Sequence, residues 1–68
     1  MNNRIKIERA IKGLTQKALA DKIGVSRQTI NSIENNRYIP STILALKLSK
    51  VFDLSVNELF ELEDEDEL

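Results

Sequence analysis

The chain has 68 residues, contains neither cysteine nor histidine, and sets ten lysines and arginines against eleven aspartates and glutamates. A chain of this length supports one small hydrophobic core, and the missing thiols and imidazoles exclude disulfides, the common zinc sites and the most frequent catalytic groups. The formal charge of −1 combines +6 over residues 1–57 with −7 over residues 58–68, so the near-neutral total does not exclude a polyanionic partner.

We therefore expect a single non-enzymatic domain with no catalytic residue, no metal and no cofactor. The first residues mix charged and apolar side chains, without the continuous apolar stretch of a signal peptide or a membrane span. We expect a cytoplasmic protein with no membrane partner.

The first two predicted elements are short helices that each end at a glycine. The first covers residues 3–12, since Gly13 suits the left-handed position that follows a helix. The second covers residues 16–23, with Thr15 as its N-cap and Gly24 after its last residue.

A third helix is predicted over residues 27–35, where Ser26 is the N-cap and Ile30 and Ile33 form a narrow apolar stripe. It is joined to the second helix by a turn of only three residues, within the segment QKALADKIGVSRQTINSIEN. Two short helices joined by a glycine-containing turn are typical of a helix-turn-helix unit.

Two further helices complete the predicted all-α, five-helix domain over residues 1–60. Ser41 caps the fourth helix, which runs to about residue 52, and Ser55 begins a capping-box pattern for the fifth, which runs to about residue 60. Residues 61–68 are nearly all acidic and have too little apolar surface to offset their ordering, so we expect a solvated, flexible tail.

The face of the third helix opposite its apolar stripe is almost entirely polar. Arginine can bond guanine and glutamine or asparagine can bond adenine through two hydrogen bonds, while a threonine methyl can contact thymine. The candidate base-reading residues on this helix are Arg27, Gln28, Thr29, Asn31 and Ser32. Candidate phosphate contacts lie at the start of the second helix and the end of the third: Gln16, Asn35 and Arg37.

The sequence resembles the Cro and phage-repressor type of helix-turn-helix regulators, the xenobiotic response element family, over residues 2–60. Three stretches carry the resemblance: NRIKIERA, GLTQKALADKIGVSRQTINSIEN and YIPSTILALKLSKVFDLSVNELF. It implies a compact lambda-repressor-like domain that binds DNA and regulates transcription. Base reading by Arg27, Gln28 and Ser32, phosphate contact by Gln16 and Asn35, and a buried ion pair between Arg9 and Glu34 are implied by this resemblance.

Several positions have a plainer interpretation beside the functional one. The polar residues of the third helix could simply form its solvated face. Likewise, Arg9 and Glu34 could form an ordinary exposed ion pair. Asn36 stands where many relatives have glycine, and asparagine is the next best residue for a positive φ. Tyr38 is interpreted as a packing residue of the loop. The acidic tail is either only solvated or competes with DNA for the basic body.

The residues and the resemblance together predict a repressor that binds a palindromic operator as a homodimer, with residues 27–35 in the major groove. Two apolar pairs are candidates for self-association: Ile7 with Ile11, and Ile43 with Leu46. The alternative from another class is a protein-interaction or antitoxin-like module. Its acidic tail or exposed apolar residues would hold a protein partner, and DNA binding would be secondary.

Overall fold

The computed structural model describes residues 1–67, and Leu68, the last residue of the predicted tail, lies outside the described residues. Its helices are α1 (Ile5–Ile11), α2 (Gln16–Ile23), α3 (Arg27–Glu34), α4 (Thr42–Phe52) and α5 (Val56–Leu59). Two short strands, β1 (Asn2–Asn3) and β2 (Phe60–Glu61), and a 3-10 turn, η1 (Asp64–Asp66), complete the described part of the chain. The predicted five-helix, essentially all-α fold is confirmed.

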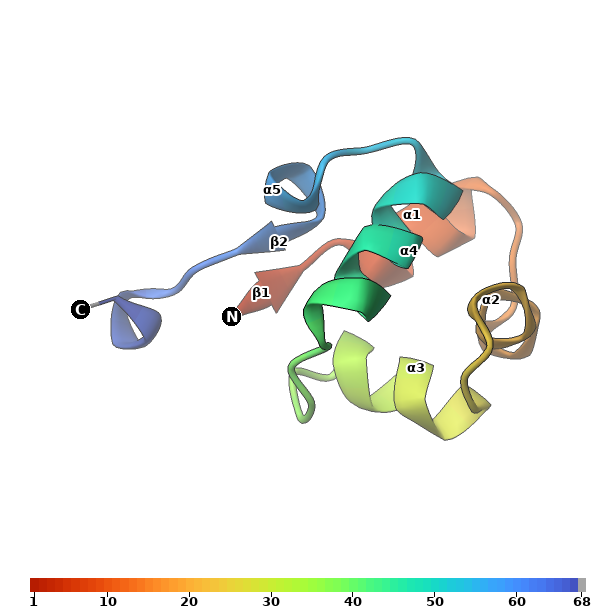
Figure 1. The fold of residues 1–68 in the computed structure, drawn as a ribbon, viewed down its shortest axis with the longest axis horizontal. Coiled ribbons are helices and arrows are strands. Elements are labelled where there is room, and N and C mark those ends of the chain that lie inside the picture. Colours follow the sequence, from red (N-terminus) through yellow and green to blue (C-terminus); the bar gives the residue numbers. More distant parts are fainter. Residues whose placement is uncertain (68) are drawn as a thin grey trace.

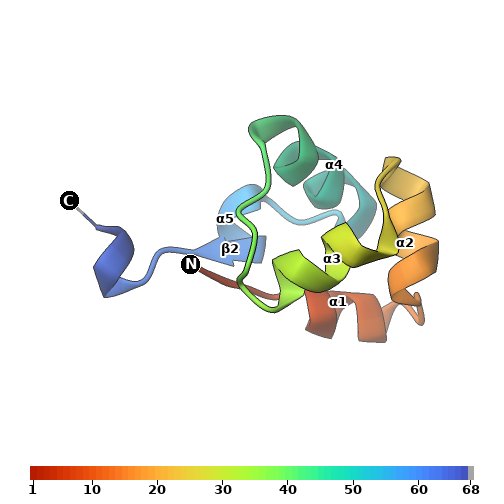
Figure 2. The same ribbon diagram turned by 90° about the horizontal axis from the view of Figure 1, so that it is seen from below.

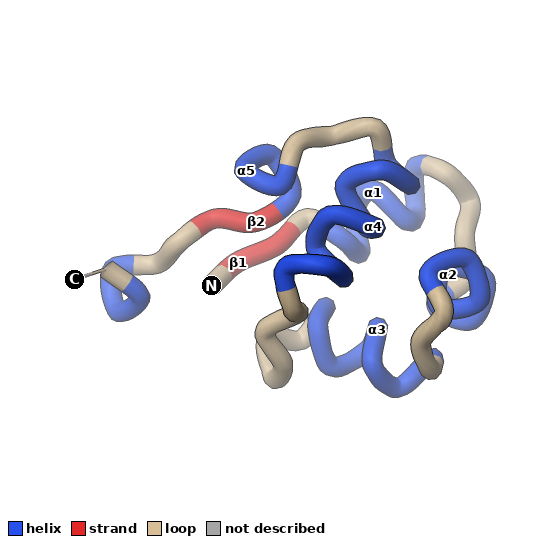
Figure 3. The backbone as a smooth tube through the Cα atoms, in the orientation of Figure 1, coloured by secondary structure: helices blue, strands red, loops and turns tan. Residues whose placement is uncertain are grey.

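The helices surround one core, with α3 along the lower edge of the molecule in Figure 1 and α2 at its right-hand end. Seen from below, α3 lies nearest the viewer, between α1 and α4 (Figure 2). The amino terminus and the two strands lie toward the other end (Figure 3). α3 therefore lies at the surface of the molecule, with its outer side turned away from the other helices.

The predicted starts of helices α2 to α5 are confirmed by their capping hydroxyl groups. The side-chain oxygen of each N-cap accepts a hydrogen bond from the backbone N–H three residues later. The bonds are Thr15 to Ala18 (3.0 Å), Ser26 to Thr29 (3.1 Å), Ser41 to Leu44 (3.2 Å) and Ser55 to Glu58 (3.1 Å). Local sequence thus sets where each of these helices begins.

The core draws on every helix and on the first residue of β2. Its buried side chains are Ile5, Leu19, Ala20, Ile23, Ile30, Ile33, Leu44, Leu48, Phe52, Leu59 and Phe60. Of the three isoleucines of α1, Ile5 is fully buried, whereas Ile7 and Ile11 are 50% and 70% exposed. No helix within residues 1–67 is long and apolar enough to cross a membrane.

The prediction that the first helix begins at residue 3 is wrong. Asn2 and Asn3 are extended and pair antiparallel with Glu61 and Phe60, so α1 begins only at Ile5. The Asn3 side chain then joins two helix ends, since its amide donates to the Ile33 carbonyl (2.9 Å) and its oxygen accepts from the Ile5 N–H (3.1 Å). The same pairing ends α5 at Leu59, one residue before its predicted end.

The acidic segment after β2 contacts the amino terminus of the chain. The Met1 ammonium lies 3.0 Å from a Glu63 carboxylate oxygen and 2.8 Å from an Asp66 carboxylate oxygen, and the Glu63 N–H donates to Asp66 (3.0 Å). In the described part of the chain, no group of three or more acidic side chains is arranged to hold a metal ion. The division of the chain into a domain and a flexible tail at residue 60 stays a prediction, and β2 spans that boundary.

We expect the contact between η1 and the amino terminus to depend on pH. The hydrogen bonds that the Met1 ammonium donates to the Asp66 and Glu63 carboxylates raise its pKa above its usual 8.0, and the bond from that ammonium lowers the pKa of Asp66 below its usual 3.8. The ammonium stabilises the contact fully below pH 8.0 and loses its effect as the pH rises through the higher folded pKa. The Asp66 carboxylate stabilises it fully above pH 3.8 and loses its effect as the pH falls through the lower folded pKa.

The amide resonances of Glu63 and Asp66 should therefore shift at both ends of a pH titration, at the alkaline end as the ammonium loses its proton and at the acid end as Asp66 gains one. Acetylation of the amino terminus is the matched control, because it removes the ammonium charge and should abolish the alkaline transition. Identical titrations of the free and acetylated chains would contradict the prediction.

Candidate nucleic-acid interface

The turn between α2 and α3 is fixed by backbone hydrogen bonds. Gly24 adopts a φ of +76°, and the next N–H, that of Val25, donates to the Ala20 carbonyl at 3.0 Å. An L-residue with a β-carbon adopts this conformation only at a cost, whereas glycine does so freely. Because Ala20, Ile23 and Ile30 are buried on either side of the turn, α2 and α3 are held as one unit.

The far end of α3 closes in a Schellman motif. The Arg37 N–H donates to the Ser32 carbonyl (2.8 Å) and the Asn36 N–H to the Ile33 carbonyl (3.1 Å). Asn36 takes the left-handed position with a φ of +59°, so asparagine does serve there in place of glycine. Its side-chain oxygen also accepts a hydrogen bond from Asn3 (3.1 Å), which ties the loop to β1.

The predicted base-reading residues lie outside the apolar stripe of α3 but are not equally accessible. Arg27 and Gln28 are exposed, whereas Thr29, Asn31 and Ser32 are half-buried. The Thr29 hydroxyl is already hydrogen-bonded to the Ser26 hydroxyl at 2.9 Å. Arg27 and Gln28 are thus the side chains with the greatest freedom to reach a base edge from this face.

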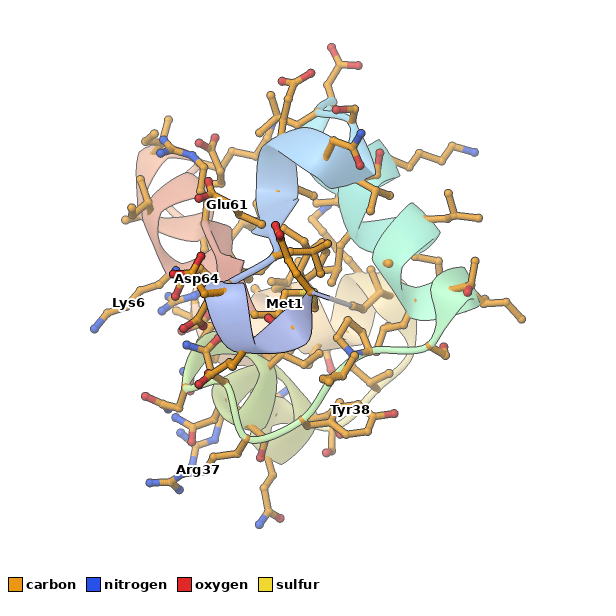
Figure 4. The ribbon with its side chains drawn as sticks, turned by 90° about the vertical axis from the view of Figure 1, so that its left-hand side faces the viewer. Met1, Lys6, Arg37, Tyr38, Glu61 and Asp64 are labelled. Atoms are coloured by element: carbon orange, nitrogen blue, oxygen red, sulfur yellow. The ribbon has the colours of Figure 1, made fainter. Side chains whose placement is uncertain are left out.

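The predicted phosphate contacts lie at both ends of the helix-turn-helix unit. Gln16 is the first residue of α2, and its side-chain amide donates to a Glu34 carboxylate oxygen at 3.2 Å. Asn35 is exposed and its side chain caps α3 by donating to the Asn31 carbonyl (2.9 Å). Arg37 is exposed, and Figure 4 shows its side chain pointing outward on the α3 side, away from Met1 and Asp64.

The ion pair between Arg9 and Glu34 is present and largely shielded from solvent. The two nitrogens Nε and Nη2 of Arg9 donate to the two Glu34 oxygens at 2.8 and 3.2 Å, and Nη1 donates to the Leu14 carbonyl at 2.9 Å. The Glu34 side chain is 3% exposed and that of Arg9 17%. Hydrogen bonding to Glu34 raises the pKa of Arg9 above its usual value. The pair links α1 to the end of α3 and, through Gln16, to the start of α2.

A groove of about 570 Å³ runs beside the outer face of α3, between that helix, the loop after it and α4. Gln28, Thr29 and Ser32 lie along its α3 side. Tyr38, interpreted from the sequence as a packing residue, is 46% exposed and lines the groove. The α4 side contributes residues that the sequence analysis did not assign to DNA binding: Ser41, Ile43 and Lys47. No sequence pattern predicts that they lie beside α3, because α4 is placed next to α3 only by the tertiary fold.

Replacing Arg37 with alanine is expected to weaken binding to every duplex alike. A lysine or arginine that contacts a phosphate releases counterions, so its loss should lower the slope of log K against log salt by about one unit. Binding to two unrelated duplexes over a range of salt concentrations measures this effect. An unchanged slope would remove Arg37 from the interface.

Comparison with known proteins agrees with this geometry. The model of a helix-turn-helix family matches residues 5–59. An uncharacterized HTH-type transcriptional regulator of Methanocaldococcus jannaschii is 47% identical, over 97% of this chain and all of that protein. The DNA-binding domain of SinR from Bacillus subtilis has a TM-score of 0.76 and 39% identity, with 90% of each chain covered. The restriction-modification controller protein C.AhdI from Aeromonas hydrophila also has a TM-score of 0.76, with 33% identity over 84% of this chain and 86% of that one. The chain therefore belongs to the helix-turn-helix family of Cro and phage-repressor type, the DNA-binding regulators of transcription that its capped α2–turn–α3 unit resembles.

Proposed function

We propose that this protein is a sequence-specific transcriptional repressor that inserts α3 into the major groove of a palindromic operator as a homodimer. The observation that carries this proposal is the outer face of α3, which presents polar side chains from a helix fixed at both ends. The body that holds this face, residues 1–57, has a charge of +6, which favours a polyanionic partner.

In this proposal the exposed residues Arg27 and Gln28 read base edges through paired hydrogen bonds. Thr29, Asn31 and Ser32 are half-buried and contact bases or the sugar-phosphate backbone. Phosphates lie at the two ends of the unit, at Gln16 on one side and at Asn35 and Arg37 on the other. Contacts of this kind fix the position of α3 but carry no sequence information themselves.

A second copy of the chain is proposed to cover an apolar surface away from α3. Ile39 and Leu46 are 69% and 57% exposed, and both line a groove of about 250 Å³ beside Pro40 and Phe60. A two-fold dimer would place two copies of α3 on half-sites about one helical turn apart, roughly 34–36 Å. Repression would then follow from occupancy of the operator.

Selection of duplexes from a random pool tests the proposal. An enriched palindrome, with half-sites about 10 base pairs apart, together with a dimer in sedimentation velocity, is the expected result. An enriched sequence without symmetry would overturn the dimer and keep the base reading. No enrichment at all would overturn sequence-specific binding and favour the alternative, a protein-interaction module that uses the same exposed apolar surface.

A further inference from the structure

The groove beside α3 carries positive charge only. Among the residues that line it, Arg37 and Lys47 are the charged ones, and no carboxylate lies among them. Arg37 comes from the loop after α3, and Lys47 comes from α4. The lining therefore favours an anionic chain over an apolar or a basic occupant.

Lys47 lines this groove from the α4 side. Its ammonium donates to the Ile23 carbonyl at the end of α2 (3.4 Å), so the side chain extends from α4 toward the α2–α3 turn. Lys50, three residues later on the same helix, is also exposed but does not line the groove. The two lysines thus carry the same charge, but only Lys47 lines the groove.

The position of the groove indicates which anion it receives. A helix in the major groove has a sugar-phosphate strand on each flank. Gln16 lies on the α1 side of the α2–α3 unit, because it bonds Glu34, the partner of Arg9. The other flank is the side on which Gln28, Thr29 and Ser32 face the groove. Ile43, which is 69% exposed there, offers an apolar wall for a deoxyribose ring.

We propose that this groove seats the second sugar-phosphate strand of the bound duplex, with Lys47 as a phosphate contact from α4. This inference rests on the proposed function and extends it, because it adds to the DNA-binding surface a helix outside the helix-turn-helix unit. Lys47 contributes affinity through its charge and leaves the preference among sequences to α3.

The test compares three variants of the full chain: Lys47→Gln, Lys47→Arg and Lys50→Gln. Both glutamine variants remove one positive charge from α4, so the long-range field of the protein changes alike. Glutamine keeps a donor for the Ile23 carbonyl, and a thermal melt of each variant checks that the fold is retained. Affinity for the selected operator and for an unrelated duplex is measured over a range of salt concentrations.

Lys47→Gln should lose about fivefold to tenfold in affinity for both duplexes at 0.1 M salt and about 0.9 in salt slope, as expected for one phosphate contact. Lys47→Arg should keep both values, and Lys50→Gln should change them much less than Lys47→Gln. Equal losses in the two glutamine variants would overturn the proposal and keep DNA binding.

A wild-type chain that binds no duplex would overturn the proposed function as well as the groove. If Lys47→Gln does not fold, the wild-type chain still decides the question through its amide resonances on addition of operator DNA. Shifts at Ser41, Ile43 and Lys47 support a strand in the groove, and their absence, with shifts confined to α2 and α3, overturns it.

Discussion

Replacing Arg9 with alanine is expected to lower the free energy of unfolding by about 3–5 kcal/mol, the range measured when one partner of a buried ion pair is removed. In the intact pair the Glu34 side chain is 3% exposed, and the variant leaves its carboxylate without the opposing charge and with the Gln16 amide as its remaining hydrogen-bond donor. A domain of this size has a total stability of roughly 3–10 kcal/mol, so the loss would unfold much of the protein at physiological temperature. Chemical denaturation monitored by circular dichroism measures the difference.

The reverse change, Glu34→Ala, should cost less. It strands an arginine that is 17% exposed and still bonded to the Leu14 carbonyl, so part of its charge remains solvated and paired. Arg9→Lys is the conservative control, because it keeps the charge and loses the paired hydrogen bonds, and it should fall between the wild type and Arg9→Ala. A loss below about 1 kcal/mol in Arg9→Ala would place the pair in the class of exposed salt bridges.

Arg27→Ala or Gln28→Ala is expected to cost about 1–3 kcal/mol in operator binding, roughly 5-fold to 150-fold in affinity. Each variant should also relax the preference at one position of each half-site, because the missing side chain no longer distinguishes the base opposite it. Competition binding with operators changed at single positions measures both effects.

Lys22→Ala is the matched control for Arg27→Ala, since it removes an exposed positive charge from the last turn of α2. It should weaken binding slightly and leave the preference among bases unchanged. If Arg27→Ala weakens all duplexes equally, Arg27 contacts a phosphate and does not read a base.

The helices of the central unit, and the faces that they bury, could be predicted from the amino-acid sequence. Thr15 and Ser26 cap α2 and α3 as expected, since the capping bond joins residues only three apart. Ile30 and Ile33 are buried, as their helical spacing predicts, and the rest of α3 is left as the polar face. These features depend only on residues close together in the sequence, so they can be predicted without the tertiary structure.

The ends of the chain are different, because their conformation depends on distant partners. The helix propensity of Asn3 does not exclude a helix at this position, but Asn3 is extended because it pairs with Phe60. The choice among the isoleucines of α1 was likewise made by packing, which buries Ile5 and leaves Ile7 and Ile11 exposed. Periodicity alone does not decide this in a helix whose apolar residues fall on two faces.

The site shows the same division. The family resemblance pointed to Arg9 and Glu34, and the outer face of α3 followed from its own periodicity. The groove beside that face became visible only in the folded chain, because Lys47 is 20 residues beyond Arg27 in the sequence and lies on another helix. The side chains that α3 presents to solvent thus follow from the local sequence. The charges that lie beside them come from other elements, and their positions depend on the packing of the core, which places α4 next to α3.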